Sequence, residues 1–249
     1  HYETSGSNGD IEVECTGLPA KQFLTSSEIS FCLPATDVIS DSELRISVKS
    51  VNGKTNVSAA QSADARLEIF SRLPRRTPLL EEYTGTGCGW CPRGGVGLEK
   101  MTEIYGDRFV GLAYHCADIM SIFEEKDYPS PAPAQPVAWI DRTRETDPYL
   151  GDMPLTTPAF GIDRVWEEAA QRFTPADMSL ACHWVDENRN AIEAKVTANF
   201  VKSYDDADFR MVYILVEDGL TGTGPEWAQG NYYSGETGKW PDDLQFLVD

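Results

Sequence analysis

Two cysteines stand close together in the stretch TGTGCGWCPRGG, residues 84–95, where two residues separate Cys88 from Cys91 and a proline follows the second thiol. A Cys-x-x-Cys pair has three common uses. It can exchange disulfides with other thiols, supply half of a tetrahedral zinc site, or form a small structural disulfide. Each use needs different surroundings, so the flanking sequence is the evidence that separates them.

The flanking sequence predicts a strand before the pair and a helix after it. Residues 79–83, LLEEY, are an apolar-led run, and residues 96–106, VGLEKMTEIYG, repeat apolar side chains at helical spacing and end in glycine. A thiol at a helix N-terminus meets unpaired N–H groups and the positive end of the helix dipole, which lower its pKa. Pro92 suits a first helical turn, whereas Gly94 and Gly95 each cost about 1 kcal/mol relative to alanine if helical.

The other two uses find less support. Tetrahedral zinc needs four ligands, but the chain has no second cysteine pair, and His115 and His183 lie far apart without ligand spacing. A disulfide between positions this close shuts a very small loop and contributes little conformational entropy. Both readings stay open as alternatives. The strand-then-helix context favours redox exchange, with no metal and no cofactor expected.

A family resemblance points the same way. The string EEYTGTGCGWCPRG, followed by FVGLAYH and later by WIDR, resembles the active-site region of thioredoxin-like proteins. More narrowly, it resembles the Omp-type thioredoxin-like outer-membrane or surface lipoproteins of Bacteroides-like bacteria, over about residues 78–174. The resemblance implies an extracytoplasmic thiol–disulfide oxidoreductase in the periplasm, at the outer membrane or on the cell surface. It also implies membrane tethering through a lipidated N-terminus outside this chain.

The resemblance assigns catalytic roles to three residues. Cys88 would attack a substrate disulfide and Cys91 would resolve the mixed disulfide. Glu82 lies where thioredoxins place a buried acid behind the dithiol, and a desolvated carboxylate there would take the proton from Cys91. An exposed strand glutamate is the alternative for Glu82, because its pKa rises only if it is buried.

Substrate contacts are expected on two other segments. Pro136 opens PVAWIDR at the place of the thioredoxin cis-proline, so Gln135 and Pro136 are predicted to seat the substrate chain. Trp90 would shape the substrate surface, or else pack beside the loop. The chain departs from thioredoxins in having Gly87 before the first cysteine instead of tryptophan. It also has a long insert at residues 116–135, predicted to form a lid or a partner-binding surface.

Composition limits the partners. The 249 residues carry 21 basic and 40 acidic side chains, a formal net charge of −19, which repels nucleic acid phosphates. The expected partners are therefore protein thiols and disulfides and a redox partner protein, with no nucleic acid. No apolar run of about 18 residues is present to span a membrane. The start, HYETSGSNGD, lacks a signal-peptide pattern and suits a polar tether.

The fold prediction is an α/β thioredoxin-like domain flanked by two small all-β, sandwich-like domains. The predicted boundaries are residues 1–73 for the N-terminal β domain with its polar lead, 74–174 for the thioredoxin-like domain and 175–249 for the C-terminal β domain. A joint with two prolines and three arginines, SRLPRRTP, lies between the first two.

Local patterns predict the elements within each domain. The N-terminal domain contains the alternating runs IEVEC, EISFCLP, LRISVKSV and ARLEIF, with an Asn-Gly turn at residues 52–53. In the middle domain, residues 108–115 are predicted to be a buried strand, 136–142 another strand and 160–173 a helix. The C-terminal runs MSLACHWV, AIEAKVTANFV and FRMVYILVEDG predict a three-stranded meander.

The remaining cysteines are expected to be small buried residues. Cys15 and Cys32 lie on predicted neighbouring strands, so a disulfide between them is the alternative. Cys116 follows a predicted strand, and Cys182 alternates with Leu180 in the predicted meander.

A second function class stays open beside the enzyme. The thioredoxin-like domain can serve as a rigid scaffold in a non-catalytic cell-surface binding or adhesion protein, with a permanently oxidised pair and β domains that bind. The acidic charge and the polar N-terminal lead suit both classes.

Overall fold

The chain is mixed α/β, with several small sheets and few helices. The computed structural model describes residues 11–15, 22–24, 42–51, 53–59, 61–68, 70–122, 134–152, 158–236 and 239–248. It divides into two compact units. The first comprises His1–Leu73 with Val201–Ser203, and the second comprises Pro74–Phe200 with Tyr204–Asp249. The three domains expected from the sequence, with their boundaries after residues 73 and 174, stay a prediction.

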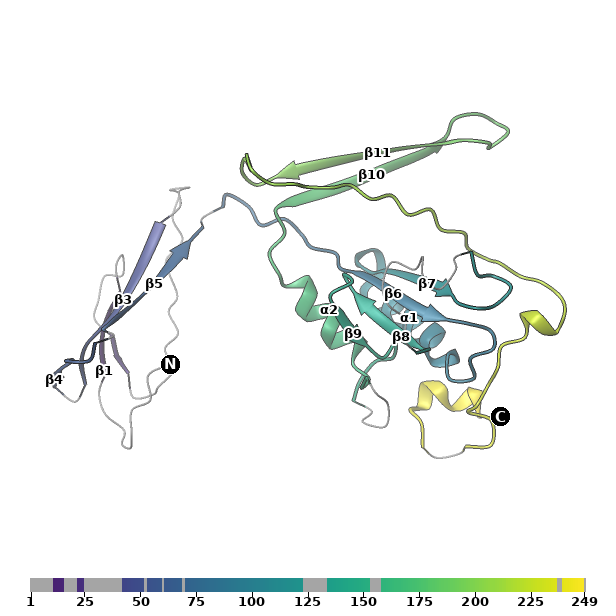
Figure 1. Cartoon of the computed structure of the whole chain (residues 1–249), viewed down its shortest axis with the longest axis horizontal. Coiled ribbons are helices and arrows are strands. Elements are labelled where there is room, and N and C mark those ends of the chain that lie inside the picture. The colour runs from purple at the N-terminus through teal and green to yellow at the C-terminus, as the bar shows by residue number, and fades with distance from the viewer. Residues whose placement is uncertain are drawn as a thin grey trace. The chain divides into compact units, whose positions relative to one another are not determined.

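The first unit contains an antiparallel five-stranded sheet (Figure 1). Its strands are β1 (Ile11–Cys15), β2 (Gln22–Leu24), β3 (Ser42–Val51), β4 (Lys54–Thr55) and β5 (Ser62–Leu67). β3 is the longest and pairs with β1, β4 and β5. Val51 pairs with Lys54, and Gly53 has a φ of 73°, as expected for the predicted Asn-Gly turn. The run EISFCLP and the question of a Cys15–Cys32 disulfide lie outside the described residues and side chains.

The second unit is built on a four-stranded sheet. Its strands are β6 (Leu79–Thr84), β7 (Val110–His115), β8 (Val137–Ile140) and β9 (Arg144–Thr146), in the order β7-β6-β8-β9. β6 and β7 are parallel, and the other pairs are antiparallel. Helix α1 (Pro92–Tyr105) and a short 3-10 helix, η1 (Gly106–Arg108), connect β6 to β7, and α2 (Ile162–Ala170) follows β9 (Figure 1). The βαβ connection therefore places the cysteine pair between β6 and α1.

The core of this unit joins the two central strands to both helices. Its buried residues are Leu80, Met101, Ala138, Ile140, Ile162, Trp166 and Ala169. Trp166 of α2 is the largest of them. Its indole N–H donates to the carbonyl of Pro78 (3.3 Å), and its ring lies 4.4 Å from that of Tyr105, centroid to centroid. Trp166 thus ties α2 to α1 and to the start of β6.

Two sequence predictions for this unit need correction. Residues 108–115 were expected to form a buried strand, yet β7 lies at the sheet edge and Val110 is 43% exposed. Apolar composition favours burial, but an edge strand has a neighbour on only one side. The helix predicted over residues 96–106 begins earlier, at Pro92. Gly94 and Gly95 are therefore helical despite their low helix propensity.

The C-terminal meander is confirmed for two of its three strands. β10 (Ala176–Trp184) and β11 (Ile192–Phe200) form an antiparallel hairpin. The third run, FRMVYILVEDG, belongs to no strand of the described chain, because alternation predicts an extended backbone but not a partner edge. One face of the hairpin carries Met178, Leu180 and Trp184, which are 69%, 63% and 47% exposed. Cys182 lies on that same face and is exposed, so its predicted burial is wrong.

The tail contains two further short 3-10 helices. They are η3 (Pro225–Trp227) and η4 (Asp242–Leu247). Leu244 and Val248 pack with Tyr149, Phe160 and Tyr233 in a second buried cluster. The C-terminal tail is therefore anchored to the α/β unit by apolar contacts.

Replacing Trp166 with alanine should strongly destabilise the second unit. The change removes a 3% exposed ring from the core and leaves a cavity, at an expected cost of about 3–5 kcal/mol in the free energy of unfolding, measured by urea denaturation. Ile104→Ala on α1 is the control, since Ile104 is 55% exposed and its truncation should cost far less. Equal losses in the two variants would contradict this core assignment.

Candidate functional site at the cysteine pair

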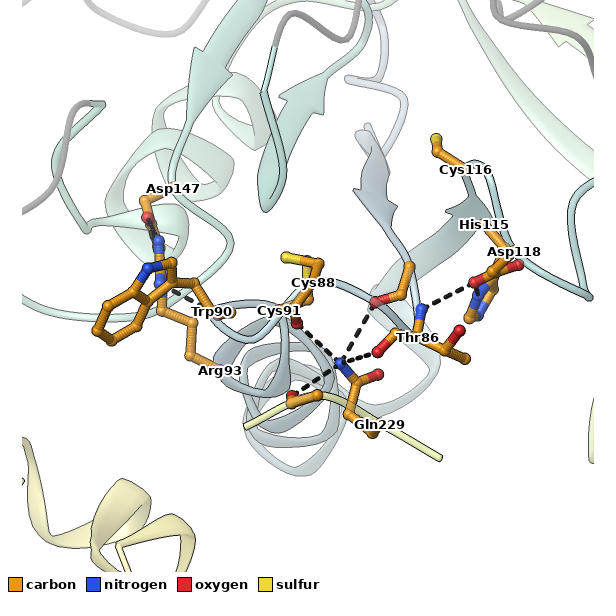
Figure 2. The surroundings of a disulfide bond; sticks show 12 residues. Thr86, Cys88, Trp90, Cys91, Arg93, His115, Cys116, Asp118, Asp147 and Gln229 are labelled. Atoms are coloured by element: carbon orange, nitrogen blue, oxygen red, sulfur yellow. Dashed lines mark hydrogen bonds and ion pairs between the residues drawn. A yellow bond between two sulfur atoms is a disulfide. The ribbon is translucent and has the colours of Figure 1, made fainter. Parts of the chain in front are cut away.

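Cys88 and Cys91 form a disulfide at the start of α1 (Figure 2). Their sulfurs are 2.03 Å apart and their Cα atoms 5.3 Å apart. Cys91 is the N-cap residue of α1 and only 2% exposed, whereas Cys88 is partly exposed. Cys88 is therefore the more accessible residue of the pair.

Consecutive turns lead from β6 through the pair into the helix. The backbone N–H of Cys88 donates to the carbonyl of Gly85 (3.0 Å), that of Cys91 to Cys88 (3.1 Å), and that of Gly94 to Cys91 (2.9 Å). Each bond spans three residues, as in 3-10 geometry. The loop thus winds into α1 and places Cys91 at the helix N-terminus.

Of the two alternatives for Glu82 of β6, the buried carboxyl is the one found, rather than an exposed strand glutamate. The residue is 1% exposed, and its Oε1 has no hydrogen-bond partner in the described structure. Burial raises the pKa of Glu82 to about 8. The negative charge of Asp147 acts in the same direction, and the positive charge of Arg93 opposes both. Glu82 is therefore mostly protonated at neutral pH.

Gly94 makes room for this carboxyl group. A Cβ atom built on Gly94 would lie 1.6 Å from Oε1 of Glu82, closer than any two such atoms can approach. The amide of Gly94 also donates to the carbonyl of Cys91. The acid therefore lies against the helix backbone one turn after the buried cysteine.

An ion pair that the sequence analysis missed lies beside the acid. Arg93 and Asp147 have side chains 7% and 1% exposed, and the guanidinium meets the carboxylate at 2.6 Å (Nη2–Oδ2) and 2.9 Å (Nε–Oδ1). Nη1 of Arg93 also donates to the carbonyl of Trp90 (3.1 Å) and to the hydroxyl of Tyr233 (3.2 Å). Residues 93 and 147 share no motif, so only the fold brings them together.

Gln135 and Pro136 lie beside the loop that precedes the cysteines. Pro136 is buried, and the Gln135–Pro136 peptide bond is cis, as the resemblance implies. A Cβ built on Gly85 would lie 3.0 Å from Oε1 of Gln135 and 2.8 Å from the carbonyl oxygen of Cys116. Glycine at position 85 thus lets these two segments close around the loop. The middle of the predicted insert, residues 123–133, lies outside the described chain.

Trp90, between the cysteines, packs against the C-terminal tail. Its ring makes edge contacts with Tyr232 and Tyr233, at centroid distances of 5.6 and 5.3 Å, and a tilted contact with Trp240 at 5.8 Å. Of the two readings of Trp90, packing beside the loop is the one that the structure shows. No sequence pattern placed the tail at this site.

Asp118, which follows β7, holds the backbone of Thr86 at the start of the loop (Figure 2). Oδ2 of Asp118 accepts from the backbone N–H of Thr86 (2.9 Å) and lies 2.7 Å from Nδ1 of His115. Burial alone would raise the pKa of Asp118, but hydrogen bonds from His115 and from backbone amides hold it below its usual value.

The Cys116 thiol, which is partly exposed instead of buried, donates to the carbonyl of Tyr114 (3.5 Å).

The described part of the chain contains neither a cluster of metal-binding side chains nor a membrane-spanning helix. There, no three or more His, Cys, Asp or Glu side chains gather in a way that could hold a metal ion. None of the described helices has the length and apolar character needed to cross a membrane.

Comparisons with protein-family models, curated sequences and solved structures find nothing that matches this chain.

Neighbouring glycines in α1 should respond oppositely to alanine. Gly95 is exposed with nothing within 4 Å of a built Cβ, so Gly95→Ala should raise the free energy of unfolding by about 0.5–1 kcal/mol. Gly94→Ala should lower it by about 1–3 kcal/mol, because the buried Glu82 must move. Urea denaturation of the oxidised protein measures both. A stabilising Gly94→Ala change would show that Glu82 does not occupy this space.

Glu82→Gln should change how stability depends on pH. With a pKa of about 8 in the folded state and 4.5 as its ordinary value, Glu82 keeps a proton that the unfolded chain loses between these limits. The free energy of unfolding therefore falls by on the order of a few kcal/mol as the pH rises from about 4.5 to 8. Above that pH it levels off. The free energy of unfolding of each protein is measured by urea denaturation at pH 5 and at pH 8.5. The change between the two pH values in the wild type, minus the change in the glutamine variant, is the contribution of Glu82. Parallel pH profiles for the two proteins would contradict it.

Proposed function

We propose that this protein is an extracytoplasmic thiol–disulfide oxidoreductase of thioredoxin-like fold, acting on protein disulfides and dithiols through Cys88 and Cys91. The observation that carries the proposal is the asymmetry of the pair. A partly exposed Cys88 is bonded to a buried Cys91 at the N-terminus of α1, and the protonated Glu82 lies against Gly94 in the first turn of that helix. Exchange requires one accessible sulfur and one that is protected and nearby.

The surrounding fold supports the thioredoxin-like assignment. The pair lies in a βαβ unit of parallel β6 and β7, which is the context in which Cys-x-x-Cys is read as a redox motif. A buried acid and a cis X–Pro bond next to the loop are two further features of the family resemblance. These features support the class, but fold likeness does not fix the substrate.

The exchange starts from the disulfide seen in the structure. A substrate thiolate attacks the sulfur of Cys88, a bond forms between these two sulfurs, and the Cys88–Cys91 bond breaks with Cys91 leaving as thiolate. The second substrate thiolate then attacks the substrate sulfur of the mixed disulfide and releases Cys88. The substrate loses two electrons to become a disulfide, and the protein pair gains them as a dithiol. Reduction of a substrate disulfide is the same sequence reversed, with a dithiol protein restoring the reduced pair.

Glu82 supplies the proton that this exchange needs. With a pKa of about 8, its carboxyl can donate to the Cys91 thiolate as that sulfur leaves, and its carboxylate can take the proton back in the reverse direction. An acid whose pKa lies near the working pH performs both transfers well. Its place against Gly94, one turn after Cys91, supports this role.

Substrate contacts are proposed at the partly exposed side of the pair. Gln135 and Pro136 lie against the loop at Gly85, and the proposal has them seat an extended substrate segment. The extracytoplasmic location, membrane tethering and a redox partner protein are parts of the same proposal and follow from the family resemblance.

The rival function is a surface-binding protein with a permanently oxidised pair. The observation in its favour is the β10–β11 hairpin, whose apolar face is exposed, because exposed apolar patches are typical of interaction surfaces. The two functions make different demands on Cys88, which only the enzyme must keep reactive.

Reduction of insulin disulfides in the presence of dithiothreitol distinguishes the two. Wild type should catalyse it, and Cys88→Ser should reduce the rate to background because the attacking sulfur is gone. Cys91→Ser should also lose turnover and should trap substrate as a mixed disulfide, visible on a non-reducing gel. Cys182→Ser is the control and should keep full activity, since Cys182 lies on the exposed hairpin outside the pair. A wild type with no activity would support the scaffold and contradict the enzyme.

A further inference from the structure

A segment from the C-terminal tail, Glu226–Tyr233, runs along the loop that carries the cysteines, and we call it the C-terminal strap. The backbone N–H of Gly230 donates to the carbonyl of Thr86 (2.7 Å), and that of Tyr232 donates to the carbonyl of Gly89 (2.9 Å). The Thr86 hydroxyl donates to the carbonyl of Glu226 (3.3 Å). The strap therefore holds the loop by backbone contacts from residues about 140 positions away.

Gln229 is the centre of this contact. Its side-chain Nε2 lies 2.8 Å from the carbonyl oxygen of Cys88 and 3.3 Å from those of Gly85 and Thr86 (Figure 2). The same nitrogen also lies 3.1 Å from the carbonyl oxygen of Gly230 in the strap itself. Its two N–H groups are thus shared among three loop carbonyls and one strap carbonyl. In Figure 2 the amide approaches the loop backbone on one side, while the sulfur of Cys88 projects to the other. Gln229 can therefore order the loop without covering the reactive sulfur.

The loop needs such external order because glycine occupies every second position of it. Gly85, Gly87 and Gly89 give the chain many conformations to lose when it becomes fixed. A Cβ built on Gly87 would meet nothing within 4 Å, whereas one on Gly89 would lie 2.3 Å from the ring of Tyr232. Part of the loop is thus open, and the strap covers the part next to Cys88.

We propose that Gln229 is a positioning residue for Cys88, and that the strap favours the disulfide over the dithiol. When the pair is reduced, the bond between the sulfurs no longer restrains the glycine-rich loop. The contacts of Gln229 then keep the loop in the conformation in which the two sulfurs meet. Keeping two thiols in place raises their effective concentration toward one another, which stabilises the disulfide. As a statement about catalysis this inference rests on the proposed function, which it deepens by assigning control of redox potential to the tail.

Equilibration of the full chain with glutathione redox buffers tests the inference. The oxidised fraction is measured by alkylation of thiols and mass analysis. Gln229→Ala should lower the equilibrium constant for disulfide formation about tenfold, roughly the contribution of one hydrogen bond, which makes the reduction potential about 30 mV less negative. Gln229→Met keeps the length of the side chain without its N–H groups and should give the same shift, so the test survives if the alanine variant folds poorly.

Gln245→Ala is the matched control. Gln245 also belongs to the tail and its amide also donates to a backbone carbonyl, that of Trp240 (2.7 Å). Among the described residues, its side chain makes no hydrogen bond to the loop. Its variant should keep the wild-type potential. An unchanged potential in both Gln229 variants, or an equal shift in Gln245→Ala, would overturn the inference, whatever happens to the melting temperature. Because this equilibrium requires no turnover, a protein inactive on insulin that still shows the Gln229 shift would refute only the proposed function.

Discussion

Burial of ionisable groups around the first turn of α1, directly after the cysteine pair, is the constraint on which this site depends. Glu82 from β6, Arg93 from α1 and Asp147 after β9 are all nearly inaccessible to solvent. An unpaired charge there would cost several kcal/mol, so the charges must be matched or removed. Arg93 and Asp147 neutralise one another through guanidinium hydrogen bonds, whereas Oε1 of Glu82 has no hydrogen-bond partner in the part of the chain that the structure describes. Its carboxyl therefore keeps its proton, and a protonated acid lies against the first turn of α1, the helix that follows the buried cysteine.

Glycine lets the backbone pack around this arrangement. Gly94 allows the carboxyl of Glu82 to touch α1, and Gly85 allows Gln135 and the Cys116 carbonyl to approach the loop. Each glycine also weakens local order, and the structure compensates with contacts from distant segments. Asp118 fixes Thr86 from the end of β7, and the C-terminal strap fixes the carbonyls that follow. Glycine therefore both allows these close backbone contacts and makes the loop depend on contacts from distant segments.

Much of the second unit could be predicted from local pattern. The apolar-led run LLEEY lies within β6, the 3.6-residue period around Trp166 became α2, and two alternating runs became β10 and β11. The errors fall where a neighbour decides the outcome. β7 has the composition of a central strand but lies at an edge, FRMVYILVEDG has no strand partner in the described chain, and Cys182 lies on an exposed face. The apolar composition of a segment shows that it could be buried, but its position in the sheet determines whether it is buried.

The sequence by itself determined the cysteine pair and its place between a strand and a helix, because these depend on residues close together along the chain. The candidate acid at Glu82 was implied by the family resemblance. Tertiary structure decided that Glu82 is buried, that Arg93 pairs with Asp147, and that Gln229 and Tyr232 reach the loop. Those contacts join residues 54 to about 140 positions apart. Periodicity describes only neighbours along the chain, so contacts at such separations arise when helices and strands pack their apolar faces together.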